Sequence, residues 1–354
     1  MTTTAGTERT PGERKMVYVR LGNSGLKVSK IILGCMSYGT SEWMPWVLSR
    51  DEGVKHIKAA YDAGINCFDT ANIYSNGLSE EILGQAIKEH RLPRDEIVVM
   101  TKVCELVTRT QTERHRGETN PEDFGYVNQR GLSRKHIFDS VKHSLDRLQL
   151  SYIDVLQCHR FDPNTPISET MQALHDIVKL GYVRYIGMSS CYTWQFMAMQ
   201  NYALNNGLTP FISMQNHYSL VYREEEREMN PALKHMGVGS IPWSPLARGL
   251  LTRPLDSEKT TRGGYDRWIA MYLKDSGAEE IVRRVEQVAR EKGVKMSHVA
   301  LAWVLQKEPV SAAVVGTTSL NNLKDLIAAL DVKLSSEEMQ FLEEPYRPMP
   351  IIGH

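Results

Sequence analysis

Long hydrophobic runs and an excess of one charge are both missing from this sequence. Lys and Arg together number 42, as do Asp and Glu, so the formal net charge is zero over 354 residues. No block of like charges offers an electrostatic footprint for nucleic acid or for an anionic membrane. No stretch approaches the ~18 consecutive apolar residues of a membrane span. We therefore predict no nucleic-acid and no membrane partner, and expect a small, neutral ligand instead.

The N-terminus lacks the apolar core of a secretory signal, because MTTTAGTERTPGERK is polar. It predicts a flexible arm over residues 1–16 and a cytoplasmic protein. The sequence also lacks a C-x-x-C pair, and its cysteines are odd in number, five in all. We expect reduced, core-filling thiols at Cys35, Cys67, Cys104, Cys158 and Cys191. Neither a disulfide framework nor a metal site is predicted.

Two common phosphate-binding motifs are missing as well. No G-x-G-x-x-G follows a run of strand type, and no G-x-x-x-x-G-K-S/T occurs in the chain. A nucleotide cofactor would therefore have to be held differently from the way a Rossmann fold or a P-loop holds it.

What is present is an alternation of short apolar runs with amphipathic stretches, which is typical of a parallel sheet. Eight runs are predicted strands: residues 30–34, 66–70, 97–102, 153–159, 185–190, 211–215, 239–243 and 312–316. Between the first two, Val54, Ile57 and Tyr61 recur at helical spacing before Gly64 ends the run. The near-even strand spacing favours an α/β fold of the closed (β/α)8 type, a TIM barrel, over an open doubly wound sheet.

Capping residues predict where two of the helices begin. Thr165 is the expected cap of the helix after the fourth strand, with Pro166 in its first turn. Near the C-terminus, Ser335 and Glu338 have the spacing of a capping box.

The length exceeds the ~250 residues typical of one such barrel, but not by enough for two ordinary domains. We predict a single domain over residues 17–354. Residues 17–29, VYVRLGNSGLKVS, alternate around an N-S-G turn and predict a β-hairpin that could plug the bottom of the barrel. The βα loops 104–132 and 247–278 and the tail 333–354 exceed a short connection, which makes them candidates for function.

Polar groups stand where three successive predicted strands stop. Asp69 closes the second strand with Tyr74 on its loop, Lys102 ends the third, and His159 ends the fourth. Each has an ordinary structural alternative, since Asp can cap a helix, Lys can snorkel, and His or Tyr can pack in the core. Because active sites of such barrels lie at the C-terminal ends of the strands, the joint occurrence favours catalysis.

The four residues make chemical sense as a set. A free tyrosine holds its proton tightly, with a pKa of ~10. The ammonium of Lys102 would stabilise the phenolate of Tyr74, and Asp69 would keep that lysine charged and oriented. His159 could donate a hydrogen bond to a substrate carbonyl oxygen. Such a site protonates a carbonyl oxygen while a second reagent delivers hydride to the carbon.

These residues carry a family resemblance. GINCFDTANIYSNGLSEEILG, Gly64 to Gly84, resembles the signature G-x-N-x-F-D-T-A-x-x-Y-x-x-G-x-S-E-x-x-x-G of the aldo-keto reductase superfamily. The resemblance extends from Val17 to about Leu342 through TK (101–102), YIDVLQCHR (152–160), GYVRYIGMSS (181–190) and PWSPLARGLLT (242–252). RLGNSGLKVS, NQRGLSRKHI and LEEPYRP are similar to the fungal and yeast branch of aryl-alcohol dehydrogenases and versiconal hemiacetal acetate reductase.

The resemblance implies an NADP-dependent oxidoreductase that reduces an aldehyde or ketone. It assigns Tyr74 as general acid, Lys102 and Asp69 as the pair that tunes it, and His159 as the residue that orients the carbonyl group. The branch also implies a place in fungal secondary metabolism.

The same resemblance implies a nicotinamide dinucleotide extended across the barrel mouth, NADPH with NADH as the alternative. The carboxamide would be bound by Ser189, Ser190 and Gln215. The remaining implied contacts are Trp243 under the ring, Ser244, Leu246 and Gly249 at the pyrophosphate, and Gly316 and Thr317 at the adenosine end. Asn322 stands where relatives often carry a basic residue for the 2′-phosphate, with Arg248, Arg253 and Lys324 as candidate replacements.

Large apolar side chains are frequent in the segments after the strands. The expected substrate wall is Tyr38, Trp43, Trp46, Tyr218 and Trp268, with Tyr222, Tyr265, Met271 and Tyr272 as further candidates. Aromatic walls suit flat, apolar carbonyl compounds of an aromatic or polyketide-like kind. The alternative is that half of these rings simply pack loops onto the barrel.

Two other functions remain open at this point. The chain could be a nucleotide-binding regulatory subunit, or a non-redox biosynthetic enzyme that uses the same acid for a dehydration or cyclisation. The intact set of four residues favours the reductase. We expect a monomer or a weak homo-oligomer.

Overall fold

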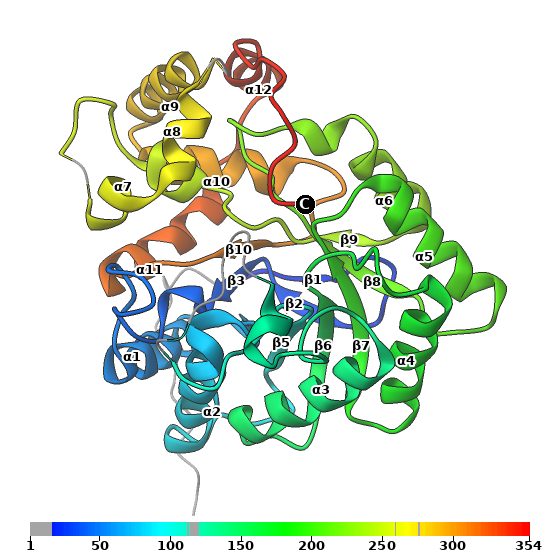
Figure 1. Cartoon of the computed structure of the whole chain (residues 1–354). Coiled ribbons are helices and arrows are strands. Elements are labelled where there is room, and N and C mark those ends of the chain that lie inside the picture. The colour runs from blue at the N-terminus through cyan, green and yellow to red at the C-terminus, as the bar shows by residue number, and fades with distance from the viewer. Residues whose placement is uncertain (1–15, 112, 114–119, 259, 275–276) are drawn as a thin grey trace, which may run out of the picture.

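A parallel sheet curled into a barrel forms the centre of the molecule (Figure 1). The computed structural model describes residues 16–111, 113, 120–258, 260–274 and 277–354. Its eight-stranded sheet has the order β10-β3-β4-β5-β6-β7-β8-β9. The strands are β3 (Ile31–Gly34), β4 (Cys67–Asp69), β5 (Val98–Val103), β6 (Ile153–Cys158), β7 (Val183–Ser189), β8 (Phe211–Gln215), β9 (Gly239–Ser240) and β10 (Ala313–Val315).

The two ends of the sheet meet, so the barrel closes. Single parallel bridges join Ser240 to Val310 and Trp243 to Val314, and the Val314 amide donates to the Pro242 carbonyl at 2.9 Å. Pro242 has no amide hydrogen of its own, so it can only accept in this pairing. All eight predicted strands are present, and the predicted (β/α)8 barrel is confirmed.

Helices follow the strands and cover the outside of the barrel (Figure 1). They are α1 (Arg50–Asp62), α2 (Leu78–Glu89), α3 (Arg134–Leu148), α4 (Ile167–Lys179), α5 (Thr193–Asn205), α6 (Met229–Met236), α9 (Ala278–Lys292), α10 (Met296–Gln306) and α11 (Leu320–Leu326). Past the end of α1, Gly64 takes a φ of 88°, which glycine adopts without strain.

One of the two predicted helix caps is wrong. Pro166 itself is the N-cap of α4, and the Thr165 hydroxyl donates to the Asp162 carboxylate at 2.6 Å instead of accepting from the helix. The same carboxylate accepts from the Leu132 amide at 2.7 Å, so it ties the segment before α4 to the end of the 104–132 loop. The capping box of Ser335 and Glu338 is confirmed at the start of α12 (Ser336–Glu343).

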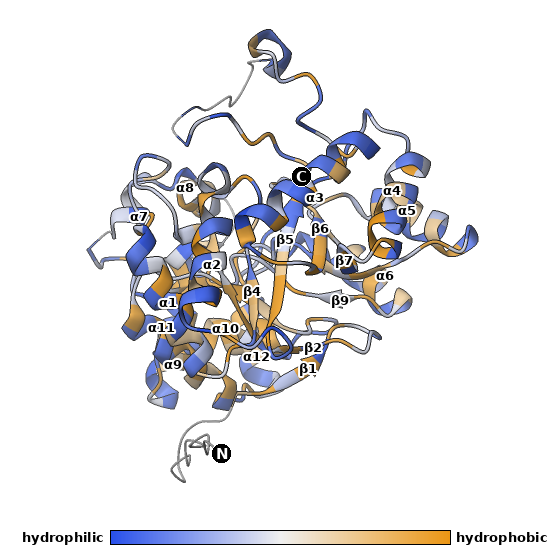
Figure 2. Ribbon diagram, turned by 90° about the horizontal axis from the view of Figure 1, so that it is seen from below, coloured by the Kyte–Doolittle hydropathy of each residue, from blue (hydrophilic) through white to orange (hydrophobic). Residues whose placement is uncertain are grey.

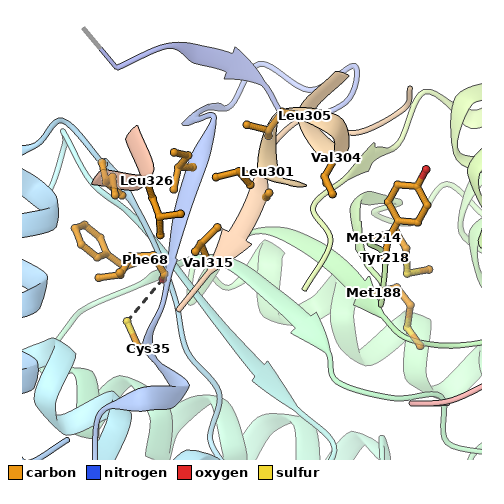
Figure 3. Packing of buried hydrophobic residues seen from close by; sticks show 14 of the residues in the cluster. Cys35, Phe68, Met188, Met214, Tyr218, Leu301, Val304, Leu305, Val315 and Leu326 are labelled. Atoms are coloured by element: carbon orange, nitrogen blue, oxygen red, sulfur yellow. Dashed lines mark hydrogen bonds between the residues drawn. The ribbon is translucent and has the colours of Figure 1, made fainter. Parts of the chain in front are cut away.

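Alternation along the strands divides the apolar residues into an inner and an outer core. The inner core comprises Leu21, Val28, Ile32, Cys67, Val98, Met100, Val155, Ile241, Ala312 and Val314. The outer core lies between strands and helices, as Figure 3 shows for Phe68 near Leu326 and for Val315 near Leu301. All five cysteines are buried and free.

A hairpin closes one end of the barrel. It consists of β1 (Tyr18–Arg20) and β2 (Lys27–Ser29), and Figure 2 shows it at the end opposite to the chain's C-terminus. A Cβ on Gly22 would lie 2.6 Å from the Gly237 carbonyl oxygen, so only glycine allows this contact with the N-terminal side of β9. Leu21 and Val28 of the hairpin complete the inner core. The predicted plug is thus present.

The long segments lie around the other end. The 104–132 loop contains η3 (Pro121–Phe124), while the 247–278 loop contains η5 (Ala247–Thr252), α7 (Thr261–Tyr265) and α8 (Arg267–Leu273). After α12 the tail passes over the strands (Figure 1), and its Ile352 amide donates to the Tyr222 hydroxyl at 3.2 Å. The predicted arm, residues 1–16, lies outside the described residues except for Met16, which is buried.

Candidate active site

Three inward-facing side chains form a polar layer directly above the inner core. Because side chains alternate along a strand, a residue two positions after an inner-core residue also faces inward. Cys67, Met100 and Val155 belong to the inner core. Their partners two positions later are Asp69, Lys102 and Gln157, all buried. The fold therefore requires these polar groups to meet inside the barrel.

The layer is a closed hydrogen-bond network around one ion pair. Lys102 Nζ lies 2.6 Å from Asp69 Oδ2 and donates to the Thr70 carbonyl at 2.8 Å. The other oxygen of Asp69 accepts from Gln157 Nε2 at 2.8 Å and from Gln215 Nε2 at 2.9 Å. Every oxygen of the buried carboxylate is thus satisfied, as a stable buried charge requires.

Tyr74 and His159 lie next to this layer at the cavity surface. The third donation of Lys102 Nζ goes to Tyr74 Oη at 3.4 Å. The ring of Tyr74 contacts His159 edge to face, with centroids 5.8 Å apart. The structure therefore brings together the four predicted residues Asp69, Tyr74, Lys102 and His159.

The surroundings of Lys102 and His159 determine the charge of these two side chains. Burial alone would lower the pKa of Lys102, but the Asp69 carboxylate and the Tyr74 phenol raise it, so the lysine stays charged. Burial, with the nearby positive charges of Arg160 and Lys102, holds the pKa of His159 well below its usual range. A neutral imidazole carries one N–H and can donate it to a substrate oxygen. The site thus combines a cation, a phenol and a neutral hydrogen-bond donor.

A cavity of about 1060 Å³ opens above these residues. It is lined by Asp69, Tyr74 and His159, and extends over the ends of β8, β9 and β10 toward Asn322 and Leu326. Its volume lies at the upper end of the range of ligand pockets, about 300–1,000 Å³. An extended cofactor and a substrate could share it.

Trp243 lines this cavity with one face of its indole ring, and the other face is covered by His217. His217 stacks on it with centroids 4.2 Å apart and 8° between planes, and Tyr222 stacks on His217 at 4.1 Å. The indole N–H donates to the Ser190 hydroxyl at 3.0 Å, and His217 is held from the side by the Tyr272 hydroxyl at 2.7 Å. An immobile aromatic face of this kind fits a planar nicotinamide ring.

Nine of the ten residues predicted to bind the cofactor line the cavity. These are Ser189, Gln215, Trp243, Ser244, Leu246, Gly249, Gly316, Thr317 and Asn322. Ser190 does not line it, because its hydroxyl already holds the indole of Trp243. A Cβ on Gly316 would lie 3.2 Å from the Gly34 carbonyl oxygen, so glycine favours the close approach of the chain after β10 to the end of β3. The residues present fit a dinucleotide.

The basic groups of the cavity differ in their partners. Arg248 and Arg262 both bind Asp266, at 2.8 and 3.0 Å. Arg253 lines the same end, and within the described residues it has no carboxylate partner. A guanidinium without a partner suits a phosphate group of a cofactor. Of the candidate replacements for a 2′-phosphate clamp, Lys324 is exposed and does not line the cavity.

Of the residues predicted for the substrate wall, only Trp46 and Trp268 line the cavity. Tyr38 is fully buried and its hydroxyl faces His56 at 3.4 Å. Tyr218 is buried beside Met214 (Figure 3), with its hydroxyl bound to Glu226. Trp43 is buried against the Tyr74 ring at 6.4 Å and supports it from behind the cavity surface.

The further candidates also lie elsewhere. Tyr222 and Tyr272 belong to the ring cluster around His217, while Tyr265 is 70% and Met271 41% exposed. Loop packing, the alternative considered for such rings, accounts for most of them. Two site residues were not predicted: Gln157, which binds Asp69, and Arg160, which lines the cavity. Gln157 lies two positions before His159 and therefore faces the same side of the strand, which is the one signal in the sequence that points to it.

No group of residues able to hold a metal ion occurs in the part of the chain that the structure describes. Within the same part, no helix is long and apolar enough to cross a membrane.

Comparisons with known proteins agree with this geometry. A sequence profile of the Aldo/keto reductase family matches residues 30–347. Versiconal hemiacetal acetate reductase of Aspergillus parasiticus is 47% identical over 95% of this chain and 98% of its own. A Schizosaccharomyces pombe protein named as an aryl-alcohol dehydrogenase is 49% identical over 95% of this chain and 97% of its own. An aldo-keto reductase of Fusarium vanettenii is 47% identical over 95% and 93%.

Proposed function

This chain belongs to the aldo/keto reductase family, and we propose that it is an NADPH-dependent carbonyl reductase in which Tyr74 is the general acid. Its substrate is an aromatic or polyketide-like aldehyde or ketone, and its product is the corresponding alcohol. NADH is the alternative cofactor.

The hydrogen-bonded series Asp69, Lys102 and Tyr74 is the observation that carries the proposal. Lys102 Nζ joins the carboxylate at 2.6 Å to the phenol at 3.4 Å. An ammonium held in this way stabilises the negative charge that develops on Tyr74 Oη as its proton passes to a substrate. Neutral His159 beside the phenol supplies a hydrogen bond for the same carbonyl oxygen.

A reduced nicotinamide, when bound, supplies hydride to the carbonyl carbon. Tyr74 Oη gives its proton to the carbonyl oxygen, so the C=O double bond becomes a C–O single bond with a new O–H. His159 orients that oxygen and stabilises the negative charge that develops on it. Lys102 stabilises the phenolate left on Tyr74, and Gln157 and Gln215 hold Asp69 so that it keeps Lys102 in place.

Residues of this chain fit the cofactor as follows. The ring would lie on the open face of Trp243, its carboxamide near Ser189, and its phosphates near Ser244, Gly249 and Arg253. Trp46 and Trp268 would contact a flat substrate. We propose that the enzyme is cytoplasmic, which the five buried free thiols support. We also propose that it acts in secondary metabolism, is a monomer or a weak homo-oligomer, and has no nucleic-acid or membrane partner; the balanced charge supports the last point.

The test is the loss of reduced-nicotinamide absorbance with a panel of aromatic aldehydes, with NADPH and NADH supplied in parallel. Tyr74→Phe removes only the hydroxyl that is 3.4 Å from Lys102. Tyr265→Phe is the matched control, because that side chain is 70% exposed and does not line the cavity. We expect Tyr74→Phe to lower kcat by roughly 10²–10⁴-fold, the usual contribution of a general acid, and the control to match the wild type.

A Tyr74→Phe variant as active as the wild type would reject the phenol as proton donor. Nucleotide binding without turnover of any carbonyl compound would favour a regulatory subunit. Product formation without consumption of reduced nicotinamide would favour a non-redox biosynthetic enzyme.

A further inference from the structure

Arg160 stands beside the catalytic residues without a role in the reaction described above. It follows His159 directly in the chain and lines the same cavity. One of its nitrogens, Nη1, donates to the His159 carbonyl at 2.5 Å. Among the described residues, the other guanidinium nitrogens have no hydrogen-bond partner, and the side chain lines the cavity.

Except for Arg253, which we assign to the cofactor's phosphates, the other cations along this cavity have carboxylate partners among the described residues. Arg248 and Arg262 share Asp266, and Lys295 lies 2.9 Å from Asp325. Arg160, in contrast, has no ion pair among the described residues. The acidic group that influences it most, Glu105, has its ion pair with Arg130 at 4.0 Å.

Partial burial makes this arrangement unfavourable until an anion binds. Loss of water lowers the pKa of Arg160, and the negative charge of Glu105 offsets only part of that effect. A buried cation without a counter-ion is unfavourable. A planar guanidinium with free N–H groups is the side chain best suited to bind a carboxylate or a similar oxygen anion in a bidentate manner.

We propose that Arg160 binds an anionic oxygen group of the substrate, so that the enzyme prefers carbonyl compounds that carry a carboxylate or an equivalent anion. This inference rests on the proposed reductase function and specifies its substrate class. The anion lies near the reacting carbonyl, because Arg160 is adjacent to His159, whose ring contacts Tyr74 at 5.8 Å.

A cofactor phosphate is not the partner of Arg160. The residues that fit the cofactor's phosphates, Ser244, Gly249 and Arg253, follow β9, whereas Arg160 follows β6. In the sheet, β7 and β8 separate those two strands. The two ends of the cavity therefore hold separate anion-binding groups.

Binding of benzoate and of benzamide, measured by calorimetry, tests the proposal without requiring turnover. Benzamide has the same shape as benzoate and no charge. We expect the wild type to bind benzoate roughly 10–100-fold more tightly than benzamide, in line with hydrogen bonds to a charged group. Arg160→Gln should abolish this preference, and Arg160→Lys should retain part of it.

Arg283→Gln is the matched control, since it removes one positive charge from a side chain that is 60% exposed and outside the cavity lining. It should keep the preference for benzoate. In turnover, the ratio of kcat/KM for 4-carboxybenzaldehyde to that for methyl 4-formylbenzoate should fall by roughly 10–100-fold in Arg160→Gln.

Equal binding of benzoate and benzamide by the wild type would overturn the proposal. The proposal would also be overturned if Arg160→Gln and Arg160→Lys each weakened the binding of benzoate and of benzamide by the same factor. A purely structural role of Arg160 would affect both ligands in this way. A wild type that reduces neutral aldehydes but shows no preference for benzoate refutes only the anion site. A benzoate preference that depends on Arg160, in a protein that reduces no carbonyl compound, upholds the anion site and refutes the reductase.

Discussion

Replacing Lys102 by Met should destabilise the fold and abolish activity through two separable effects. Met has a similar length but no charge, so the Asp69 carboxylate would lose the ammonium that now lies 2.6 Å away. Both side chains are at most 2% exposed, so water cannot replace the lost partner. Breaking a buried ion pair on one side costs about 3–5 kcal/mol.

The expected shift in melting temperature follows from the size of the chain. Unfolding entropy is ~2.1 cal/mol/K per residue, which gives ~0.74 kcal/mol/K for 354 residues. Dividing the expected loss by this value predicts a melting temperature that is lower by roughly 4–7 °C.

A second variant separates stability from catalysis. In Asp69→Asn combined with Lys102→Met, no buried charge remains. The Asn side-chain oxygen can still accept from Gln157 and Gln215, which now donate to Asp69 at 2.8 and 2.9 Å. We expect more than half of the lost stability to return. Carbonyl reduction should remain at least ~10²-fold below the wild type, because Tyr74 still lacks the ammonium that stabilises its phenolate.

The assay is urea unfolding of wild type, single and double variants, followed by turnover of the same samples. A single variant as stable as the wild type would refute the view that the ion pair is a coupled buried unit. A double variant that recovers activity together with stability would refute the electrostatic role of Lys102.

Three further predictions concern other parts of the molecule. Burial raises the pKa of Glu225 to about 7, so the protonated side chain stabilises the fold at low pH and this stability is lost as the pH rises through 7. Glu225→Gln should therefore raise the free energy of unfolding by up to ~3 kcal/mol at pH 8 and change it little at pH 5. The Arg262 guanidinium lies over the Trp46 ring at 4.3 Å and so joins the loop after β3 to the 247–278 loop across the cavity. Loss of this contact in Arg262→Ala should weaken NADPH binding by roughly 2–30-fold in a fluorescence titration. Gly84→Ala should destabilise the fold by ~1–3 kcal/mol in urea, because the new Cβ would lie 2.4 Å from the Leu148 carbonyl oxygen.

Each of these has a contrary outcome. A gain for Glu225→Gln that is equal at both pH values would exclude ionisation as its cause. Unchanged NADPH affinity in Arg262→Ala, with Arg283→Ala on the exposed surface as control, would exclude the bridge between the loops. Stabilisation by Gly84→Ala would mean that helix propensity outweighs the contact between α2 and α3.

The strand ends could be predicted from the sequence because two rules act together there. Apolar runs mark each strand, and alternation along the run determines which polar residues point inward. Asp69, Lys102 and His159 are ionisable groups at such ends and were therefore found. Gln157 obeys the same alternation, but an amide is not ionisable and carries no comparable signal.

Ring orientation could not be predicted in the same way. A sequence places Tyr38 and Tyr218 in segments that follow strands, but it does not say whether a ring turns toward the cavity or away from it. Here the hydroxyls are paired with His56 and Glu226, which directs both rings into the core. The Thr165 cap failed for a related reason, since Asp162 competed for its hydroxyl.

The separation between the polar layer and the cavity walls has an evolutionary consequence. Asp69, Lys102 and Gln157 occupy strand positions, where inserting a single residue would turn a side chain to the opposite face. Trp46 and Trp268 lie in connections beyond the strands, where length and sequence can change without such a reversal. Substrate specificity could therefore change in evolution through the connecting segments alone, whereas substitution of the polar strand residues would abolish the reaction.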